Sequence, residues 1–253
     1  MESLLSGAFE IKVVAPDPPP PSPGLDPFAE QSEISPRDLY FNLLNQTLDA
    51  ITDAIECDLL APGEMVRCPE PPPPVTRVDR TTLVRRFHAD HLPPGCFRMV
   101  EGMLTGFGYL FVPLFDYEIK GSGITEATFR APYPPLLGPL PFPVTRKPSR
   151  TTMPYIDDLY IIVDFETAVA AQERAAFIAG FKTWEQLLVG GFRMTGDPQS
   201  WSNIAASEVA FVSPDRLQWN TETLLAHPAC FHLLLNMLSR RHQSHPIREV
   251  SIG

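Results

Sequence analysis

Hydrophobic and polar residues alternate between strand-like and helix-like patterns in the second half of the chain. Residues 159–165 read Leu-Tyr-Ile-Ile-Val-Asp-Phe, a β-branched and aromatic run that predicts a strand. A helix is predicted over residues 168–189, and Gly190-Gly191 follows as a stop signal. The large apolar side chains of this helix share one face: Phe177, Phe181, Trp184 and Leu188.

The rest of this half continues with two short strands, a helix and a last strand. The predicted elements are a strand over 208–212, a turn at 213–216, a return strand over 217–220, a helix capped by Thr221 and running to about Arg241, and a strand over 247–252. The order over residues 155–253 is therefore β-α-β-β-α-β. That order predicts a ferredoxin-like arrangement, in which an antiparallel sheet carries both helices on one face.

The first half is predicted to hold one helix and several strands. Ser35-Pro36 begins a helix over residues 36–59, with a cap and a proline at its first position. Residues 9–14 predict a strand. Residues 96–105 and 109–119 predict a hairpin around Gly106-Phe107-Gly108. Because this half then lacks a second helix, the pattern does not indicate an internal repeat.

Proline clusters divide the chain. The first half, residues 1–130, contains two extended connectors, at about 15–34 and 69–75. Residues 131–154 predict a proline-rich linker, and residues 155–253 form the ferredoxin-like half. The predicted class is α+β, with an antiparallel sheet and helices on one face.

Charge and composition limit the function classes. The net charge is −10, and the basic residues are scattered along the chain, which argues against nucleic-acid binding and favours a basic protein partner. Apolar residues make up 44% of the chain, enough for a sizeable core. Only four of the twenty basic residues are lysines, which with 29 prolines suggests a GC-rich coding genome.

Location is predicted from the terminus and the cysteines. Residues 1–14 lack the basic start and long apolar core of a secretory signal. No stretch reaches the roughly 20 apolar residues that a membrane span needs. The four cysteines form no C-x-x-C pair, so free thiols are expected. We therefore expect a cytoplasmic protein without a membrane segment.

The stretch Tyr155-Ile156-Asp157-Asp158 has the spelling of the metal-binding Y-x-D-D box of reverse-transcriptase palms. In a palm the aspartates lie at a hairpin turn and converge with a third carboxylate on magnesium. Here the preceding residues 146–154 do not predict a strand, so Asp157 and Asp158 begin a strand. Asp116 is the best third carboxylate. The match covers four residues, and we predict neither a metal nor another cofactor at this site.

Two histidine and cysteine clusters have spacings that could form a tetrahedral zinc site. They are His88, His91 and Cys96 in the first half, and His227, Cys230 and His232 in the second. Neither spacing matches a common zinc signature. The second cluster lies in an apolar segment, where Cys230 suits a small core position. Ordinary packing is the preferred interpretation of both clusters.

Other chemistry has little support in the sequence. There is no G-x-S-x-G nucleophile elbow and no glycine-rich phosphate loop before a helix. Aromatic strands of a ferredoxin-like sheet can stack RNA bases, but the usual basic and glycine positions are missing. Core packing is therefore expected for Tyr160, Phe165 and Phe211.

Residues 190–206 form a long connection between a helix and a strand. This loop contains four candidate partner-binding residues: Arg193, Met194, Asp197 and Trp201. Arginine, methionine and tryptophan are enriched at protein interfaces. The alternative is a loop that folds back over the core.

The preferred hypothesis is a non-catalytic protein that acts through protein–protein interaction, as an adaptor, an accessory subunit or an immunity-type inhibitor. Homo-oligomers are compatible with it. The alternative hypothesis is a metal-dependent enzyme that uses Asp157 and Asp158 or the histidine and cysteine clusters. A third hypothesis is a small-molecule binder with a cleft between the halves. The sequence favours a non-enzyme without deciding the question.

Calorimetry tests the interpretation of the Y-x-D-D spelling. Titration of the purified protein with magnesium or manganese should give no saturable heat, because a strand entry does not converge three carboxylates on one ion. Saturable binding that disappears in Asp158→Ala would show that the two aspartates are metal ligands.

Overall fold

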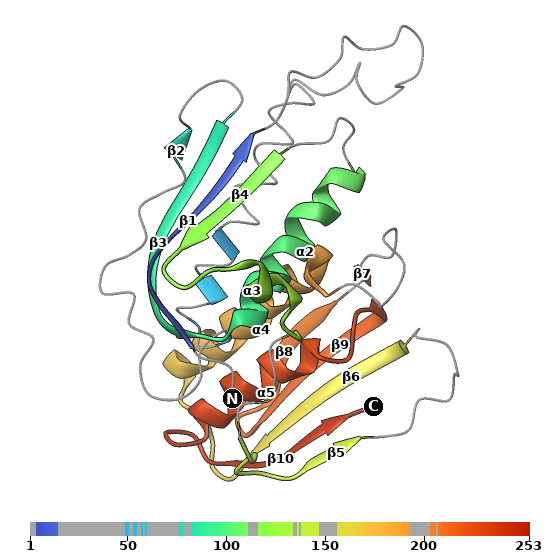
Figure 1. Cartoon of the computed structure of the whole chain (residues 1–253). Helices are drawn as coiled ribbons and strands as arrows, with labels where there is room; N and C mark the ends of the chain where they lie inside the picture. Colours follow the sequence, from blue (N-terminus) through green and yellow to red (C-terminus); the bar gives the residue numbers. More distant parts are fainter. Residues whose placement is uncertain are drawn as a thin grey trace, which may run out of the picture.

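The computed structural model describes the two halves in different detail. The described residues are 4–14, 49–50, 53–54, 57, 59, 76–77, 82–110, 116–133, 136, 138–146, 156–192, 203–205 and 207–253. Among them, two β-sheets enclose a layer of helices (Figure 1). The protein is therefore of the α+β class, with one antiparallel and one mixed sheet.

Sheet A belongs to the first half of the chain. Its strands are β1 (Leu5–Val14), β2 (Thr76–Arg77), β3 (Thr82–Leu92) and β4 (Asp116–Gly121). Their order is β2-β3-β1-β4, and all neighbouring pairs are antiparallel. The strand period of two places Phe9, Ile11 and Val13 of β1 in the interior, so that Glu10 and Lys12 lie on the outer face.

Sheet B belongs to the second half. Its strands are β5 (Val144–Arg146), β6 (Ile156–Phe165), β7 (Asn203–Ala205), β8 (Glu208–Ser213), β9 (Arg216–Leu225) and β10 (Ile247–Ile252). The order is β5-β10-β6-β9, and β7 and β8 both pair with β9. They pair with successive parts of β9 and therefore share one margin of the sheet. Among the described strands, only β5 runs parallel to its neighbour, β10.

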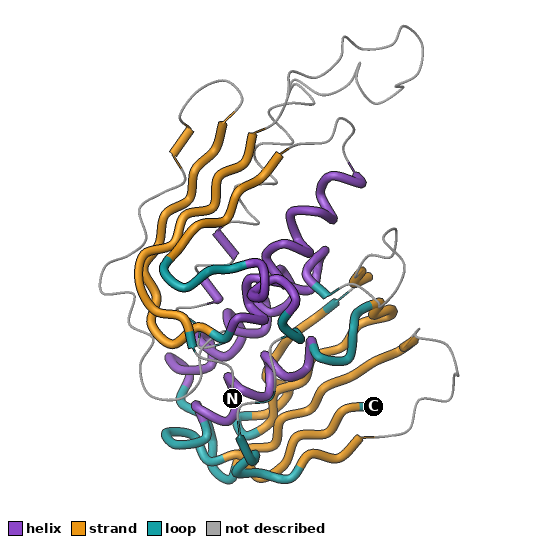
Figure 2. Tube along the Cα trace, in the orientation of Figure 1, coloured by secondary structure: helices purple, strands orange, loops and turns teal. Residues whose placement is uncertain are grey.

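The helices lie between the sheets, as Figure 2 shows in purple. They are α2 (Pro94–Leu110), α3 (Glu126–Arg130), α4 (Ala171–Gly191) and α5 (Cys230–Arg241). Helix α2 from the first half contacts α4 from the second, and buried residues of both halves join in one hydrophobic core. No helix in the described part of the chain is long and apolar enough to cross a membrane.

Two tryptophans occupy the centre of the second half. The indole of Trp184 on α4 and that of Trp219 on β9 are both fully buried, and their rings meet edge to face at 5.1 Å. The indole N–H of Trp184 donates to the carbonyl oxygen of Cys230 at 2.8 Å. This hydrogen bond links α4 to the first turn of α5, while the ring contact links α4 to the sheet.

The predicted strands and first helix of the second half are confirmed. Strand β6 covers 159–165, β8 covers 208–212 and β10 covers 247–252. Strand β6 pairs antiparallel with both neighbours, β9 and β10. Helix α4 ends at Gly191, and the whole apolar face predicted for it is buried: Phe177, Phe181, Trp184 and Leu188.

The hairpin predicted over 96–119 is wrong. Residues 94–110 form α2, and Gly106-Phe107-Gly108 lies inside this helix instead of at a turn. Pro94 at the first helical position suits a helix start, because its fixed φ and missing N–H cost nothing there. The buried positions recur at helical spacing: Cys96, Phe97, Met99, Val100, Met103 and Leu104. The first half therefore contains a second helical segment, which the hairpin prediction missed.

The helix start predicted at Thr221 is also wrong. Thr221 lies in β9, opposite Leu159 of β6, and α5 begins only at Cys230. Burial of Leu217, Trp219 and Thr221 follows the strand period of two. The predicted end of the helix at Arg241 is confirmed.

Part of the prediction for the first half lies outside the described residues. Within the predicted helix 36–59, residues 49–50 and 53–54 are helical. Ala50 and Ala54 are buried there, and the carboxylate of Asp49 pairs with buried Arg85 of β3 at 3.0 Å. The connectors at 15–34 and 69–75 lie outside the described part. Of the predicted linker 131–154, residues 144–146 form β5.

Replacement of Trp184 tests how far the core depends on this side chain. We expect Trp184→Phe to lower the free energy of unfolding by about 1–3 kcal/mol, because the hydrogen bond to the Cys230 carbonyl is lost and the smaller ring fills less of the core. Trp184→Ala should cost about 3–5 kcal/mol, since it also leaves a large cavity. Chemical denaturation measures both. Val212→Ala, on a side chain that is 57% exposed, is the control and should change little; equal losses in Trp184→Phe and the control would contradict the assigned role.

Candidate interaction surface at the junction of the halves

The four partner-binding candidates lie in a loop whose two ends the structure describes. Arg193, Met194, Asp197 and Trp201 themselves lie outside the described residues, so their role stays a prediction. The chain enters the loop at Phe192, just after α4, and leaves it at β7. The position of Phe192 therefore shows where on the molecule the loop begins.

Phe192 anchors that entry point in the core. Its side chain is fully buried, and its ring lies 5.3 Å from the ring of Tyr133. Its carbonyl oxygen accepts a hydrogen bond from the backbone N–H of His227 at 3.1 Å. Arg98, Tyr133, Phe192 and His227 together are called the junction cluster below. The loop thus starts beside residues from both halves of the chain.

Arg98 connects α2 to this cluster. Its guanidinium carbon lies 4.7 Å from the centre of the Tyr133 ring, and one of its N–H groups donates to the carbonyl oxygen of Ala131 at 3.0 Å. The centre of the Tyr133 ring lies 5.1 Å from that of the His227 ring, which belongs to the second half. A cation over an aromatic face is stabilising, and more so when partly shielded from water. Arg98 therefore fixes the segment that joins the two halves.

His227 supplies a polar but neutral group. Its Nδ1 accepts a hydrogen bond from the backbone N–H of Ala229 at 3.1 Å, which leaves the ring proton on Nε2. Burial lowers the pKa of His227 from its ordinary value, and the positive charge of Arg98 and the neighbouring His232 lower it further. At neutral pH the charge of the junction cluster is therefore that of Arg98 alone.

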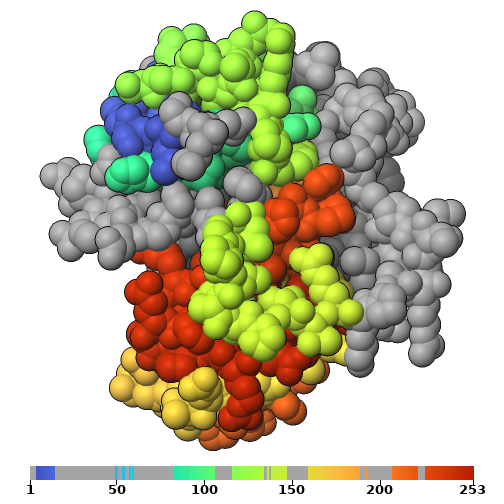
Figure 3. All heavy atoms as spheres, turned by 60° about the horizontal axis from the view of Figure 1, so that its bottom comes forward, coloured from blue at the N-terminus to red at the C-terminus, as the bar shows by residue number. Residues whose placement is uncertain are grey.

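The segment after Tyr133 continues across the second half. Figure 3 shows the described residues between 131 and 146, in yellow-green, lying against the red atoms of the C-terminal part. The ring of Phe142 packs 5.8 Å from that of His242, and the carbonyl of Pro143 accepts from the N–H of Val250 at 3.0 Å. Arg146 places its guanidinium 5.9 Å from the ring of Phe231. These contacts hold residues 142–146 against the C-terminal part of the chain.

Two of the three described cysteines are not ready nucleophiles. Cys96 and Cys230 are both buried, and burial strongly raises the pKa of each thiol. The thiolate is the reactive form, so both remain protonated and inert in the folded protein. Cys57, which is partly buried, has its sulfur 3.9 Å from the hydroxyl of Thr183 on α4.

One hydrogen-bonded chain has the composition of a catalytic triad. The Ser244 hydroxyl lies 2.9 Å from His245 Nδ1, and His245 Nε2 lies 3.0 Å from the Glu173 carboxylate. The Ser244 hydroxyl also lies 3.2 Å from the carbonyl of Arg241, which competes for its one proton. The backbone N–H groups of Ser244 and His245 both donate to that same carbonyl and cannot stabilise an oxyanion. These three hydrogen-bonded side chains therefore attach the end of α5 to α4.

The zinc constellation predicted as an alternative does not form. All six residues proposed for it are described, yet no group of three or more histidine, cysteine or acidic side chains among the described residues could hold a metal. His88 and His91 are exposed on or beside sheet A, whereas Cys96 and Cys230 are buried. Asp157 and Asp158 lie at the start of β6, as predicted, and Asp116 starts β4 in the other sheet. The side chains of Asp157 and Asp158 lie outside the described part.

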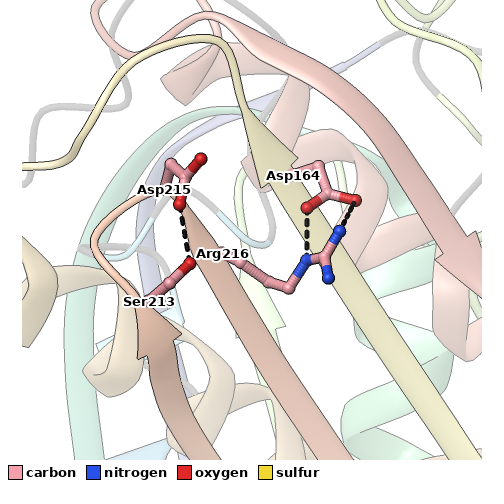
Figure 4. A network of polar contacts seen from close by, with 4 residues as sticks. All are labelled: Asp164, Ser213, Asp215 and Arg216. Atoms are coloured by element: carbon pink, nitrogen blue, oxygen red, sulfur yellow. Dashed lines mark hydrogen bonds and ion pairs between the residues drawn. The ribbon is translucent and has the colours of Figure 1, made fainter.

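The outer face of sheet B carries a polar network at the turn between β8 and β9. Figure 4 shows Arg216 holding Asp164 of β6 through two hydrogen bonds, of 2.6 and 3.2 Å. The Ser213 hydroxyl donates to Asp215 at 2.6 Å, and this bond is the main cause that lowers the pKa of Asp215. The predicted turn at 213–216 is thus confirmed and is tied to the neighbouring strand.

The outer face of sheet A carries alternating charges. Glu10 of β1 lies between Arg86 of β3 and Lys120 of β4, and Lys12 lies opposite Glu118. The Arg86 Nε lies 2.7 Å from Glu10, and the Lys120 ammonium lies 2.8 Å from Glu118. Sequence reasoning missed this face, although Glu10 with Lys12 and Glu118 with Lys120 stand two residues apart, the spacing that shares one face of a strand. It also missed Arg98 and Tyr133, which no local pattern connects.

Comparison with known proteins gives little guidance. No family model and no curated protein matches the chain. Two solved structures align over nearly its whole length: a candidate glycine cleavage system transcriptional repressor and an unknown protein from Galdieria sulphuraria. The identities are 10% and 8%, coverage is 98% of this chain and 97% and 98% of theirs, and both TM-scores are 0.22. Similarity this weak supports no conclusion about fold or function.

The pH dependence of stability tests the environment of His227. Its folded pKa lies below the unfolded value, so the unfolded chain binds this proton more readily. The contribution is favourable above about pH 6.5 and is lost as the pH falls through the folded pKa. His227→Asn keeps an acceptor for Ala229 and should flatten the decline in melting temperature between about pH 7 and 5.

Nuclear magnetic resonance titration of the His227 ring gives the direct measurement. We expect a midpoint below 6.5 in the wild type and a higher one in Arg98→Gln, because that variant removes the nearby positive charge. A wild-type midpoint at or above 6.5 would contradict the described surroundings of His227.

Proposed function

We propose that the protein is a non-catalytic binding protein that acts through contacts with other protein molecules. The observation that carries this proposal is which described side chains lie in the interior and which lie on the surface. Two of the three described thiols are buried and the third is partly buried, and the serine–histidine–glutamate chain closes a helix end. The outer face of sheet A, by contrast, presents charges of both signs in regular rows. Complementary charge on a partner can select and orient it there.

We also propose that each half is a ferredoxin-like unit. Two features support this interpretation of the second half. Apart from the short β7, the elements follow one another in the chain as β6, α4, β8, β9, α5 and β10, and the sheet order is β10-β6-β9-β8. The first half has the corresponding order β4-β1-β3-β2, with α2 between β3 and β4 and helical residues 49–50 and 53–54 between β1 and β2. The halves would then be two copies of one topology, facing each other through their helices.

Such an arrangement suits a binding protein. Each unit covers one face of its sheet with helices, and the two helical layers cover each other, so both outer faces remain for contacts. The loop after α4 begins at the junction cluster, where it can contribute a third contact region. A basic protein remains the preferred partner because the chain carries a net charge of −10. A cytoplasmic location, without a membrane role, belongs to the same proposal.

Trp201→Ala tests the loop as a partner-binding element. If Trp201 contacts the partner, the variant should keep its melting temperature and lose about 2 kcal/mol of binding, or about thirtyfold in Kd. Pull-down from the native host with mass spectrometry identifies the partner, and titration with the purified partner measures Kd. Trp184→Phe is the matched control, since it should lower stability and leave Kd unchanged.

The opposite result would place Trp201 in the core. A Trp201→Ala variant that melts at lower temperature, consistent with a loss of about 3–5 kcal/mol, and still binds the partner with wild-type Kd would contradict the contact role.

A further inference from the structure

Strand β4 forms an open margin of sheet A. Among the described strands, only β1 pairs with it, and Figure 1 shows it at the side of the sheet opposite β2. Its side chains alternate: Asp116, Glu118 and Lys120 are exposed, whereas Ile119 is buried. A strand margin of this kind offers backbone N–H and C=O groups to a further strand.

Contacts with Phe9 and with α2 hold β4 in one conformation. The Phe9 ring lies so close over Gly121 that a Cβ at this position would overlap the ring. The same ring packs 5.0 Å from Phe97 of α2. At the other end the Tyr117 hydroxyl donates to Glu101 of α2 at 3.1 Å. Both ends of β4 are thus fixed to the helix beneath, which reduces the entropy cost of adding a strand.

The charges on β4 are symmetric about Ile119. If two copies of β4 pair antiparallel with Ile119 opposite Ile119, then Glu118 of each copy lies opposite Lys120 of the other. Residues directly opposite in an antiparallel pair share a face, so these would form two ion pairs on the outer face. Tyr117 would lie opposite Gly121, where no side chain competes for space.

The neighbouring strands extend this complementarity. In one chain the register places Arg86, Glu10 and Lys120 side by side across β3, β1 and β4. Glu118 and Lys12 of a second copy would continue the same row, so that positive and negative charges alternate across five strands. The existing bond from Lys120 to Glu118, which raises the pKa of Lys120, shows that the two groups already pair within one chain.

We propose that β4 pairs with β4 of a second copy of this chain and joins two copies of sheet A into one antiparallel sheet. This rests on the proposed function, that the protein acts through protein contacts, and names one such partner. A two-fold axis through Ile119 closes the assembly, because each β4 margin is used once. The contact is small, so the expected Kd is on the order of micromolar.

The margin of sheet B that β8 forms lacks this symmetry. The register with β9 places Glu208 and Ala210 of β8 outward, and the side chain of Val212 is exposed. Self-pairing about Ala210 would place Glu208 opposite Val212 and form no ion pair. Lysine on a margin can also serve only to prevent pairing. On β4, however, Lys120 is matched by Glu118 at the spacing that self-pairing requires.

Charge reversal provides the test. Glu118→Lys would place the introduced lysine of each copy opposite Lys120 of the other, and Lys120→Glu would likewise oppose two carboxylates. Sedimentation equilibrium over about 1–200 μM, the range set by a micromolar Kd, should show a wild-type dimer and at least about tenfold weaker self-association of either variant. A mixture of the two variants should restore dimers, because each lysine then faces a glutamate. Circular dichroism confirms that both variants fold.

Glu208→Lys, which changes net charge by the same amount on the other sheet, is the matched control and should dimerise like the wild type. A wild-type monomer at every concentration, or a dimer that Glu118→Lys leaves intact, would overturn the proposal. So would a dimer that is lost in Glu208→Lys only. Failure here is distinguishable from failure of the proposed function, which depends on partner capture and on Trp201.

Discussion

The contact between α2 and α4 is the constraint on which the rest of the structure depends. Each sheet has an apolar inner face, and each is covered by helices from its own half of the chain. Because α2 and α4 also cover each other, the apolar surfaces of both halves are removed from water in one core. The outer faces are then the surfaces left for polar side chains, and the charge rows of sheet A and the Asp164–Arg216 pair of sheet B lie there.

The junction cluster follows from the same constraint. A chain that leaves the first half after α3 must cross the surface of the second before it can add β5 to sheet B. Arg98 fixes this crossing through Tyr133, and Phe192 and His227 receive the ring on the other side. The crossing and the start of the loop after α4 therefore share the same few side chains. A shift in the position of the crossing segment would therefore move the start of the loop through direct packing.

Much of the second half could be predicted from sequence because its patterns are long and uninterrupted. The run 159–165 and the apolar face of α4 each carry a clear period. The first half was harder: Gly106 and Gly108 of α2 suggested a turn, although the apolar residues before them already recur at helical spacing. Packing against sheet A and α4 outweighs the cost of those glycines. Thr221 misled for a similar reason, since a good cap residue also suits a strand when its neighbours alternate.

The candidate sites were less predictable because their parts are distant in sequence. His227 was noticed for its cysteine and histidine neighbours, yet its contacts are Tyr133 and, through its backbone, Phe192. Nothing local to Arg98 indicates that it lies over Tyr133, because 35 residues, including β4 and α3, separate them. The charge rows of sheet A depend on strand register, which the spacing of charges in one strand suggests but cannot fix without its neighbours.

The position of β10 has a consequence for the order in which the protein is made. Strand β10 lies between β5 and β6, and the N–H and C=O of Tyr160 bond to Gly253 just beyond it. Sheet B therefore cannot close until residue 253 has left the ribosome, although its other strands emerge earlier. The last strand of sheet A, by contrast, ends at Gly121. The first half can thus fold while the second is still being synthesised, and its helix α2 would wait with an uncovered apolar face.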